Sequence, residues 1–546
     1  MPLLALPTRS GRRHWTGLVA RRGIGLLLLG LVWAGAPVAG AGAAVPLNPF
    51  EAAGAARPAG RIDELVFAQL KQHGVEPAHP CSDAAFVRRV YLDVIGLLPT
   101  APEAREFLAD KNPEKRRALI DTLLAREEFA DFWAMKWSDL LRVKAEYPIN
   151  LWPNAAQAYH RWIRAAIHDD KPFDQFAREL LTANGSNFRV PPVNFFRALQ
   201  SKEPRTFAST VALTFMGTRA EKWPPERLAG LAGFFAQVGF KATGEWKEEI
   251  VFWDPTKAPA AGIGPAVFPD GTPAALSPDR DPREVFAGWL TDPKNPWFAR
   301  ALANRAWAWL LGRGIVDEPD DLRPDNPPSN PALLAYLEQE LVAAHFDLQH
   351  LFRLILNSST YQLACVARSD RPEAAGDFAA YPLRRLDAEV LIDAINQITG
   401  TSEKYTSAIP EPYTYIPEEA RAVELPDGSI TSSFLETFGR PPRDSGLEAE
   451  RNNRTSAVQR LALLNSSHIQ RKLEQGPKLQ ALLRDGQGKP RQVVDALYLT
   501  ILSRYPTEAE RKVVTEHARS GTVNGREAAL DLAWALINSA EFLYRH

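Results

Sequence analysis

Along most of the chain, apolar residues recur every three or four positions, which is the spacing of one face of an α-helix. The segment 119–124 follows this spacing after Asn112-Pro113-Glu114, and the segment 333–342 follows it after Asn330-Pro331. A polar residue followed by proline is typical of a helix start, because proline lacks the N–H that a first helical turn leaves unpaired. The pattern therefore predicts helices at both places.

Two capping boxes strengthen this prediction. Thr100 is followed three positions later by Glu103, and Thr507 by Glu510, so each pair can satisfy the free N–H groups of a helix start. The closing segment 526–546 is strongly amphipathic, whereas strand patterns are limited to 248–253 and a weaker one at 265–268. We expect a mainly α fold of two helical lobes, with a few short strands and long Pro-rich loops.

Two stretches lack periodicity. Residues 254–282 are rich in Pro, Gly and Ala and predict a linker, and residues 402–435 hold Pro and Tyr without helical spacing and predict a long loop. We therefore expect a first helical domain at 60–255, a linker at 256–282 and a second helical domain at 283–546.

The first 45 residues differ from the rest. Five arginines precede an apolar run that begins at Ile24, and small residues follow at 39–43. A basic start, an apolar middle and a small-residue end predict a secretory signal peptide at 1–44, so the mature chain is expected to be periplasmic or secreted. The alternative is an uncleaved anchor helix. No later segment has 18 uninterrupted apolar residues, so we expect no membrane association after signal cleavage.

Charge and cysteine content exclude several classes of protein. The 546 residues include 64 Lys and Arg against 65 Asp and Glu, which gives no reason to expect nucleic acid as a partner. Cys81 and Cys365 are the only cysteines. Two cysteines are too few for a zinc ribbon or an iron–sulfur cluster, although an exported protein could join them in one disulfide.

The segment 312–326 holds the densest group of side-chain oxygens. Asp317, Asp320, Asp321 and Asp325 fall in a loop broken by prolines, together with Glu318 and Asn326. Oxygen ligands on a loop suit Ca²⁺, so these four aspartates are candidate metal ligands, although the spacing is not that of an EF-hand. The alternative is a solvated acidic turn that Arg313 and Arg323 neutralise.

A second group of carboxylates begins at Arg384. Arg385, Glu389 and Asp393 are spaced at i, i+4 and i+8, and Asp387 stands off that stripe. Carboxylates on one helix face can serve acid–base catalysis, so Arg385, Asp387 and Glu389 are candidate catalytic residues. Helical ion pairs are the commoner use of this spacing.

Other conspicuous residues favour structural roles. Arg88, Arg89 and Asp93 on a mostly apolar helix predict a structural clamp. Trp307 and Trp309 could line a sugar-binding groove, but large aromatic residues more often pack between helices. The sequence has no H-E-x-x-H, G-x-S-x-G, P-loop or G-x-G-x-x-G pattern, so it indicates no familiar catalytic class.

Several segments resemble the paired domains of unknown function found in large exported, planctomycete cytochrome-associated proteins. The segments similar to the first domain are FVRRVYLDVIGLLPT, REEFADFWAMKWSDLLRVK and DDKPFDQFARELL. The segments similar to the second include PLRRLDAEVLIDAI, FLETFGRPPRD and LAWALINSAEFLYRH. The resemblance runs in consistent order from about residue 60 to the C-terminus, and this family has no established activity to carry over.

The resemblance also implies cysteines that this chain lacks. We expect relatives to carry a C-x-x-C-H pattern between the segments FMGTR and EKW, where this chain has only Ala220, and a C-x-C pattern where it has Leu447 and Ala449. Because covalent haem attachment needs the thiols and an axial histidine, we expect no haem, and electron transfer is disfavoured. We interpret the joint at 219–223 as a shortened loop in a cysteine-less branch.

These patterns lead to two hypotheses. The first is an exported accessory or interaction protein without a redox cofactor, for which the resemblance suggests a sulfatase-like or alkaline-phosphatase-like exported partner. The alternative is an extracytoplasmic hydrolase of polysaccharide or a related substrate, with Asp317, Asp320, Asp321, Asp387 and Glu389 as its candidate carboxylates. Whether the chain is an enzyme stays open at this point.

Overall fold

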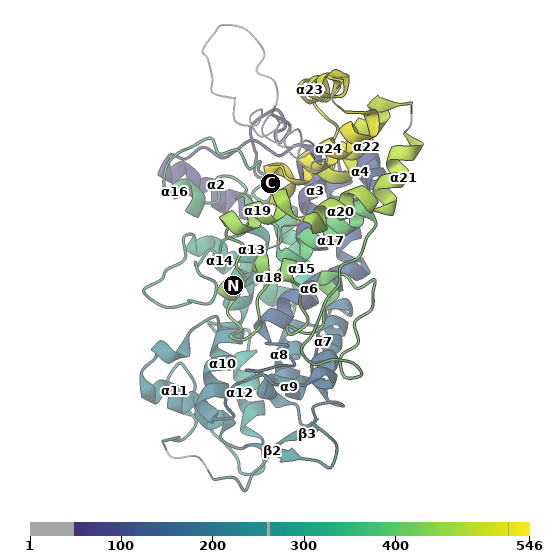
Figure 1. Cartoon of the computed structure of the whole chain (residues 1–546). Coiled ribbons are helices and arrows are strands. Elements are labelled where there is room, and N and C mark those ends of the chain that lie inside the picture. The colour runs from purple at the N-terminus through teal and green to yellow at the C-terminus, as the bar shows by residue number, and fades with distance from the viewer. Residues whose placement is uncertain (1–47, 259–261, 487, 522) are drawn as a thin grey trace, which may run out of the picture.

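The structure, a computed structural model, describes residues 48–258, 262–486, 488–521 and 523–546. The predicted signal peptide lies outside the described residues. Helices dominate and the few strands are short, so the mainly α prediction is confirmed. Figure 1 shows an elongated molecule, with the last helices of the chain at one end and a small antiparallel sheet at the other.

The helices of the N-terminal half are α2 (Arg61–His73), α3 (Asp83–Val94), α4 (Ala101–Ala109), α5 (Lys115–Leu124), α6 (Glu127–Leu140), α7 (Pro153–His168), α8 (Phe173–Thr182), α9 (Asn194–Arg197), α10 (Pro204–Met216) and α11 (Pro225–Ala232). Those of the C-terminal half are α12 (Pro282–Leu290), α13 (Phe298–Leu311), α14 (Pro331–Ala343), α15 (Leu348–Leu356), α16 (Glu373–Gly376), α17 (Ala388–Thr399), α18 (Ser433–Thr437), α19 (Ala457–Asn465), α20 (Ser467–Gln475), α21 (Pro477–Asp485), α22 (Pro490–Leu502), α23 (Glu508–Arg519), α24 (Gly525–Ile537) and α25 (Ala540–Leu543).

Local signals set the helix starts as the sequence predicts. Thr100 and Thr507 each form a complete capping box with the glutamate three positions later. Asn330 caps α14 by accepting the N–H of Leu333. In the closing segment Ser539 accepts the N–H of Phe542, which ends the long helix at Ile537 and starts the short α25.

The strands form two small antiparallel sheets. In the first, β1 (Gly185–Ser186) and β2 (Val238–Ala242) flank β3 (Glu249–Trp253), which is the strand predicted at 248–253. In the second, β4 (Arg384–Arg385) pairs with β5 (Tyr544–Arg545), so the chain end lies beside the start of α17. The weaker strand prediction at 265–268 is wrong: only Val267 forms a bridge there, to Pro273.

The two irregular stretches pack onto the helices. Ala266, within the predicted linker, packs closely against Gly233. A Cβ added to Gly233 would lie only 2.8 Å from the Ala266 Cα. The predicted loop 402–435 buries Val423, Leu425 and Ile430. Buried apolar residues of both predicted domains belong to one continuous cluster, and the division into domains stays a prediction.

Helix α3 joins the N-terminal half to the chain end. Arg88 donates to the carbonyl oxygens of Ile501 and Phe542, and Arg89 donates to that of His546. Asp93 pairs with Arg545 at 2.9 Å. The structural role predicted for these residues is confirmed, but the predicted Arg–Asp pair at i, i+4 is wrong, because Asp93 pairs with Arg545 and Arg384 and not with an arginine of its own helix.

Candidate functional site

The predicted catalytic carboxylates lie in a buried ionic cluster between α6, α17 and the segment 440–453. The cluster comprises Lys136, Asp139, Asp387, Glu389, Arg440, Arg443, Arg451 and Arg545. The segments that supply these residues are far apart in the chain. Each carboxylate in the cluster has at least two cationic neighbours.

Asp387 is the most heavily paired of these carboxylates. Its Oδ2 lies 3.0 Å from Lys136 Nζ and 2.9 Å from Arg545 Nη2, and its Oδ1 accepts a hydrogen bond of 2.6 Å from Asn453. Burial raises the pKa of this carboxyl, but Lys136, Arg451 and Arg545 together hold the pKa well below its usual range. Asp387 is therefore charged at neutral pH and has no free oxygen for a substrate.

Glu389 and Asp139 share one arginine. Arg451 lies 2.7 Å from Glu389 Oε2 and 2.6 Å from Asp139 Oδ2, and Arg443 adds a contact of 2.9 Å to Asp139. Glu389 is fully buried. This arrangement neutralises both carboxylates and closes them off from solvent.

Arg385 and Asp393 do not continue this face as the spacing predicts. Arg385 lies on β4, before α17 begins, and donates to backbone carbonyl oxygens of Phe438 and Asn452. The helical stripe that the sequence predicts is therefore wrong at its first position. Asp393 lies on α17 and accepts the backbone N–H groups of Ala422 and Val423, and burial raises its pKa to about 7.

The acidic loop spreads its carboxylates apart. Asp320 is buried and pairs with Arg305 at 2.8 Å, whereas Asp321 and Asp325 both pair with Arg323, and Asp317 pairs with Arg313. Within the part of the chain that the structure describes, no three His, Cys, Asp or Glu side chains are placed to hold a metal ion. The geometry thus matches the alternative of an acidic turn neutralised by arginines.

Glu448 connects the acidic loop to the ionic cluster. Its backbone N–H donates to Asp320 at 2.6 Å, and its carboxylate accepts the indole N–H of Trp309 at 3.0 Å. The pKa of Glu448 is raised overall, because the effect of burial exceeds the opposing effect of nearby Lys136. The candidate carboxylates of the two segments therefore meet through an internal network, not across an open cleft.

Residues near the two positions of the implied cysteines line one cavity. Glu221, which follows Ala220, and Ser445, two positions before Leu447, line a cavity of about 480 Å³, whereas Ala220, Leu447 and Ala449 are not among its lining residues. Arg142 donates from Nε to the carbonyl oxygen of Ser445 at 3.0 Å. The polar groups of this cavity near the implied thiol positions are thus a carboxylate, a hydroxyl and a guanidinium.

Both cysteines are free thiols. An antiparallel bridge between Pro80 and Leu363 brings their two segments together. The structure nevertheless forms no disulfide between Cys81 and Cys365.

The tryptophans of α13 are core residues. Trp307 and Trp309 are buried, and the Trp309 ring lies 5.2 Å from that of Trp133 and 5.6 Å from that of Trp137. The packing interpretation is therefore confirmed, and the sugar-binding alternative for these two residues is wrong.

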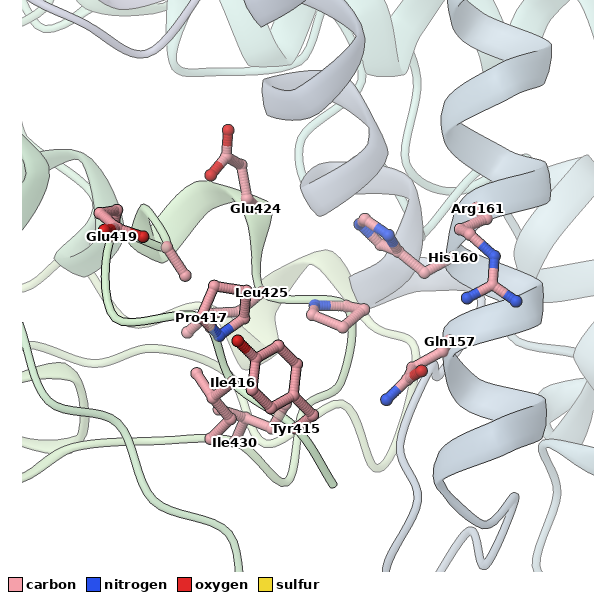
Figure 2. A pocket seen from close by; sticks show the side chains of 12 residues that line it. Gln157, His160, Arg161, Tyr415, Ile416, Pro417, Glu419, Glu424, Leu425 and Ile430 are labelled. Carbon is pink, nitrogen blue, oxygen red and sulfur yellow. The ribbon is translucent and has the colours of Figure 1, made fainter. Parts of the chain in front are cut away.

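An open cavity lies elsewhere, between α7 and the segment 415–430. Its volume is about 530 Å³, and Gln157, His160 and Arg161 line it from the helix side. Figure 2 shows these side chains facing Tyr415 and Glu419 across the cavity. This site could not be predicted from the sequence, because its polar residues form no motif and the opposite wall comes from an irregular loop more than 250 positions later.

Two family models match the chain. One, described as PSCyt2, a protein of unknown function (DUF1549), matches residues 61–221, and the other, PSD1, a protein of unknown function (DUF1553), matches residues 282–518. A search of curated proteins and a search of solved structures found no match. Among the described residues, no helix has the length and apolar character needed to cross a membrane.

Proposed function

Because the chain belongs to the family that pairs the PSCyt2 and PSD1 domains, we propose that it is an exported accessory or interaction protein that works without a redox cofactor. The observation that carries this proposal is that the buried candidate carboxylates are already paired with lysine and arginine side chains. Asp387 and Glu389 are buried in ion pairs, and Asp320 is buried against Arg305. Carboxylates held this way stabilise a scaffold and cannot approach a glycosidic bond.

The same observation weighs against the alternative hydrolase. A glycoside hydrolase needs two carboxylates on opposite sides of a cleft that admits the substrate. None of the five carboxylates that the sequence nominates lines either cavity described above. The geometry therefore favours a binding role over hydrolysis by these residues.

Helix α19 offers a surface for a protein partner. Val458, Leu461 and Leu464 are exposed and are spaced three positions apart, so they share one face of the helix. Exposed apolar side chains that gather on one face mark protein–protein contact sites. The occupant that we propose is an exported enzyme of the sulfatase-like or alkaline-phosphatase-like kind.

Affinity purification from native extracytoplasmic extract tests this proposal. The tagged mature chain should retain one exported enzyme in constant ratio, and Leu461→Glu should release it. Thr515→Glu on the exposed face of α23 is the matched control, because it adds the same charge away from α19. Recovery of the wild-type chain alone, as a monodisperse monomer, would overturn the proposal.

A further inference from the structure

The cavity between α7 and the segment 415–430 holds polar groups without partners. His160 is only 5% exposed, and its Nε2 has no hydrogen-bond partner among the described residues. A buried polar atom of this kind costs about 1–3 kcal/mol when nothing satisfies it. Figure 2 shows the imidazole on the α7 side of the cavity, where it forms part of the wall, although Nε2 itself lies beneath the surface.

Three further polar side chains surround His160. Gln157 and Arg161 lie on the same face of α7, at i−3 and i+1 from His160, and Glu419 stands on the opposite wall. The hydrogen bonds and ion pairs of the described residues include none made by these three side chains. The cavity thus offers an amide, a guanidinium and a carboxylate. Glu424 also lines the cavity but is paired with Arg421, so the unpaired lining charges are those of Arg161 and Glu419, which balance.

The segment that forms one wall of the cavity carries two exposed tyrosines, and one of them contacts further aromatic rings. Tyr415 lines the cavity and is 69% exposed. Two residues earlier, the Tyr413 ring lies 5.3 Å from that of Trp152, which in turn lies 6.4 Å from the 69% exposed Trp246. Three distant segments therefore bring the rings of Tyr413, Trp152 and Trp246 into one row, and Tyr415 lies two positions along the chain from that row.

The backbone at this row is strained. Asn150, Trp152 and Lys247 all have positive φ angles, of 62°, 72° and 63°. For a bulky residue such as tryptophan this conformation is rare, and it persists only where the surrounding structure enforces it. The strain accompanies the display of Trp152 and Trp246 at the surface.

The chemistry of this site fits a sugar chain. A sugar ring presents an apolar C–H face, which packs on an aromatic ring, and a rim of hydroxyls that both donate and accept hydrogen bonds. The amide of Gln157, the guanidinium of Arg161 and the carboxylate of Glu419 supply both kinds of partner. An anionic ligand would require an excess of free cations, and a peptide added to a sheet would require a strand edge at the cavity, neither of which the lining provides.

We propose that this cavity and its aromatic row bind a neutral polysaccharide. One sugar unit enters the cavity against His160 and Gln157, and neighbouring units stack on Tyr415, Tyr413 and Trp246. This binding is independent of the α19 surface and extends the proposed function, because it would hold the chain and its partner at a polysaccharide.

Affinity electrophoresis of the mature chain tests this proposal. The gels contain soluble β-glucan, galactomannan, xylan, starch or dextran sulfate, so that α- and β-linked neutral polymers and one polyanion are compared. Retardation by at least one neutral polymer is expected. Gln157→Ala and Tyr415→Ala should each weaken that binding about tenfold, which corresponds to the loss of one good hydrogen bond or ring contact.

The matched control is Tyr505→Ala, because Tyr505 is an exposed tyrosine outside this cavity. Its binding should equal that of the wild type. The proposal is overturned if no neutral polymer retards the chain, if dextran sulfate alone does so, or if Tyr505→Ala weakens binding as much as Tyr415→Ala. If the Tyr415→Ala variant still retains the protein partner, the proposed function stands even when the sugar-binding proposal fails.

Discussion

Replacement of Asp387 by asparagine should cost more stability than almost any other change of one charge in this chain. Asp387 is buried, and its Oδ2 is shared by Lys136 at 3.0 Å and Arg545 at 2.9 Å. Asparagine has nearly the same shape but no charge. The substitution therefore isolates the electrostatic contribution of the carboxylate.

The expected loss follows from the cations Lys136, Arg451 and Arg545 that would remain around the uncharged side chain. Removal of one partner from a buried ion pair costs about 3–5 kcal/mol, because the other charge stays desolvated and uncompensated. Arg545 retains Asp93 at 2.9 Å, so the uncompensated charge falls chiefly on Lys136. We expect about 3 kcal/mol for Asp387→Asn, which is a large part of a total stability of about 5–15 kcal/mol.

The pH dependence has a definite sign. Because the folded pKa of Asp387 lies well below the unfolded value, its carboxylate contributes stability above pH 4 that is lost as the pH falls through the folded pKa. Urea unfolding should therefore show nearly the same difference between wild type and Asp387→Asn at pH 7 and at pH 4, and a smaller difference only as the pH falls below about 4.

A matched control separates burial from charge. Asp317 pairs with Arg313 at 3.4 Å, and both side chains are more than two-fifths exposed. Asp317→Asn should change the free energy of unfolding by less than about 1 kcal/mol, as is usual for exposed pairs. If Asp387→Asn costs no more than Asp317→Asn at pH 7, the ionic cluster does not stabilise the fold as argued.

Three further predictions concern stability. Burial raises the pKa of Asp393 to about 7, so the folded chain binds this proton more tightly than the unfolded chain does. The free energy of unfolding should therefore fall as the pH rises from about 4 to about 7. If Asp393→Asn shows the same dependence of unfolding free energy on pH, this reasoning is wrong. Thr507→Ala removes a capping box and should lower the free energy of unfolding by about 1 kcal/mol, measured in urea, so a neutral effect would be unexpected. Gly439 and Gly271 both have positive φ, but a Cβ at Gly439 would overlap a backbone carbonyl oxygen, whereas one at Gly271 would meet open space. Gly439→Ala should therefore lower the melting temperature much more than Gly271→Ala does. Equal decreases in the two variants would show that this overlap does not matter.

Features that depend on neighbouring residues could be predicted from the sequence. The capping boxes at Thr100 and Thr507 and the helix start at Asn330 follow from side chains within three positions of the N–H groups that they satisfy. The strand at 249–253 is likewise a local pattern of β-branched and aromatic residues. Local chemistry alone decides these features.

The partners of charged side chains could not be predicted in this way. Lys136 and Asp387 are 251 positions apart, and Asp139 and Arg443 are 304 apart. The spacing of Arg385 suggests a helical ion pair, but the strand β4 removes it from the helix and gives it backbone carbonyl partners. A carboxylate that looks free for catalysis in the sequence can thus be the counter-ion of a distant arginine.

The charges that look catalytic and the groups that are free to bind lie in different places. Asp387 and Glu389 are surrounded by cations inside the molecule, whereas Gln157 and Tyr415 line an open cavity. Asp387→Asn should therefore weaken folding and leave the affinity of the folded fraction unchanged. Tyr415→Ala should do the reverse, since an exposed ring contributes little to stability. If Tyr415→Ala unfolded the chain, the aromatic row would be part of the core and not a binding surface.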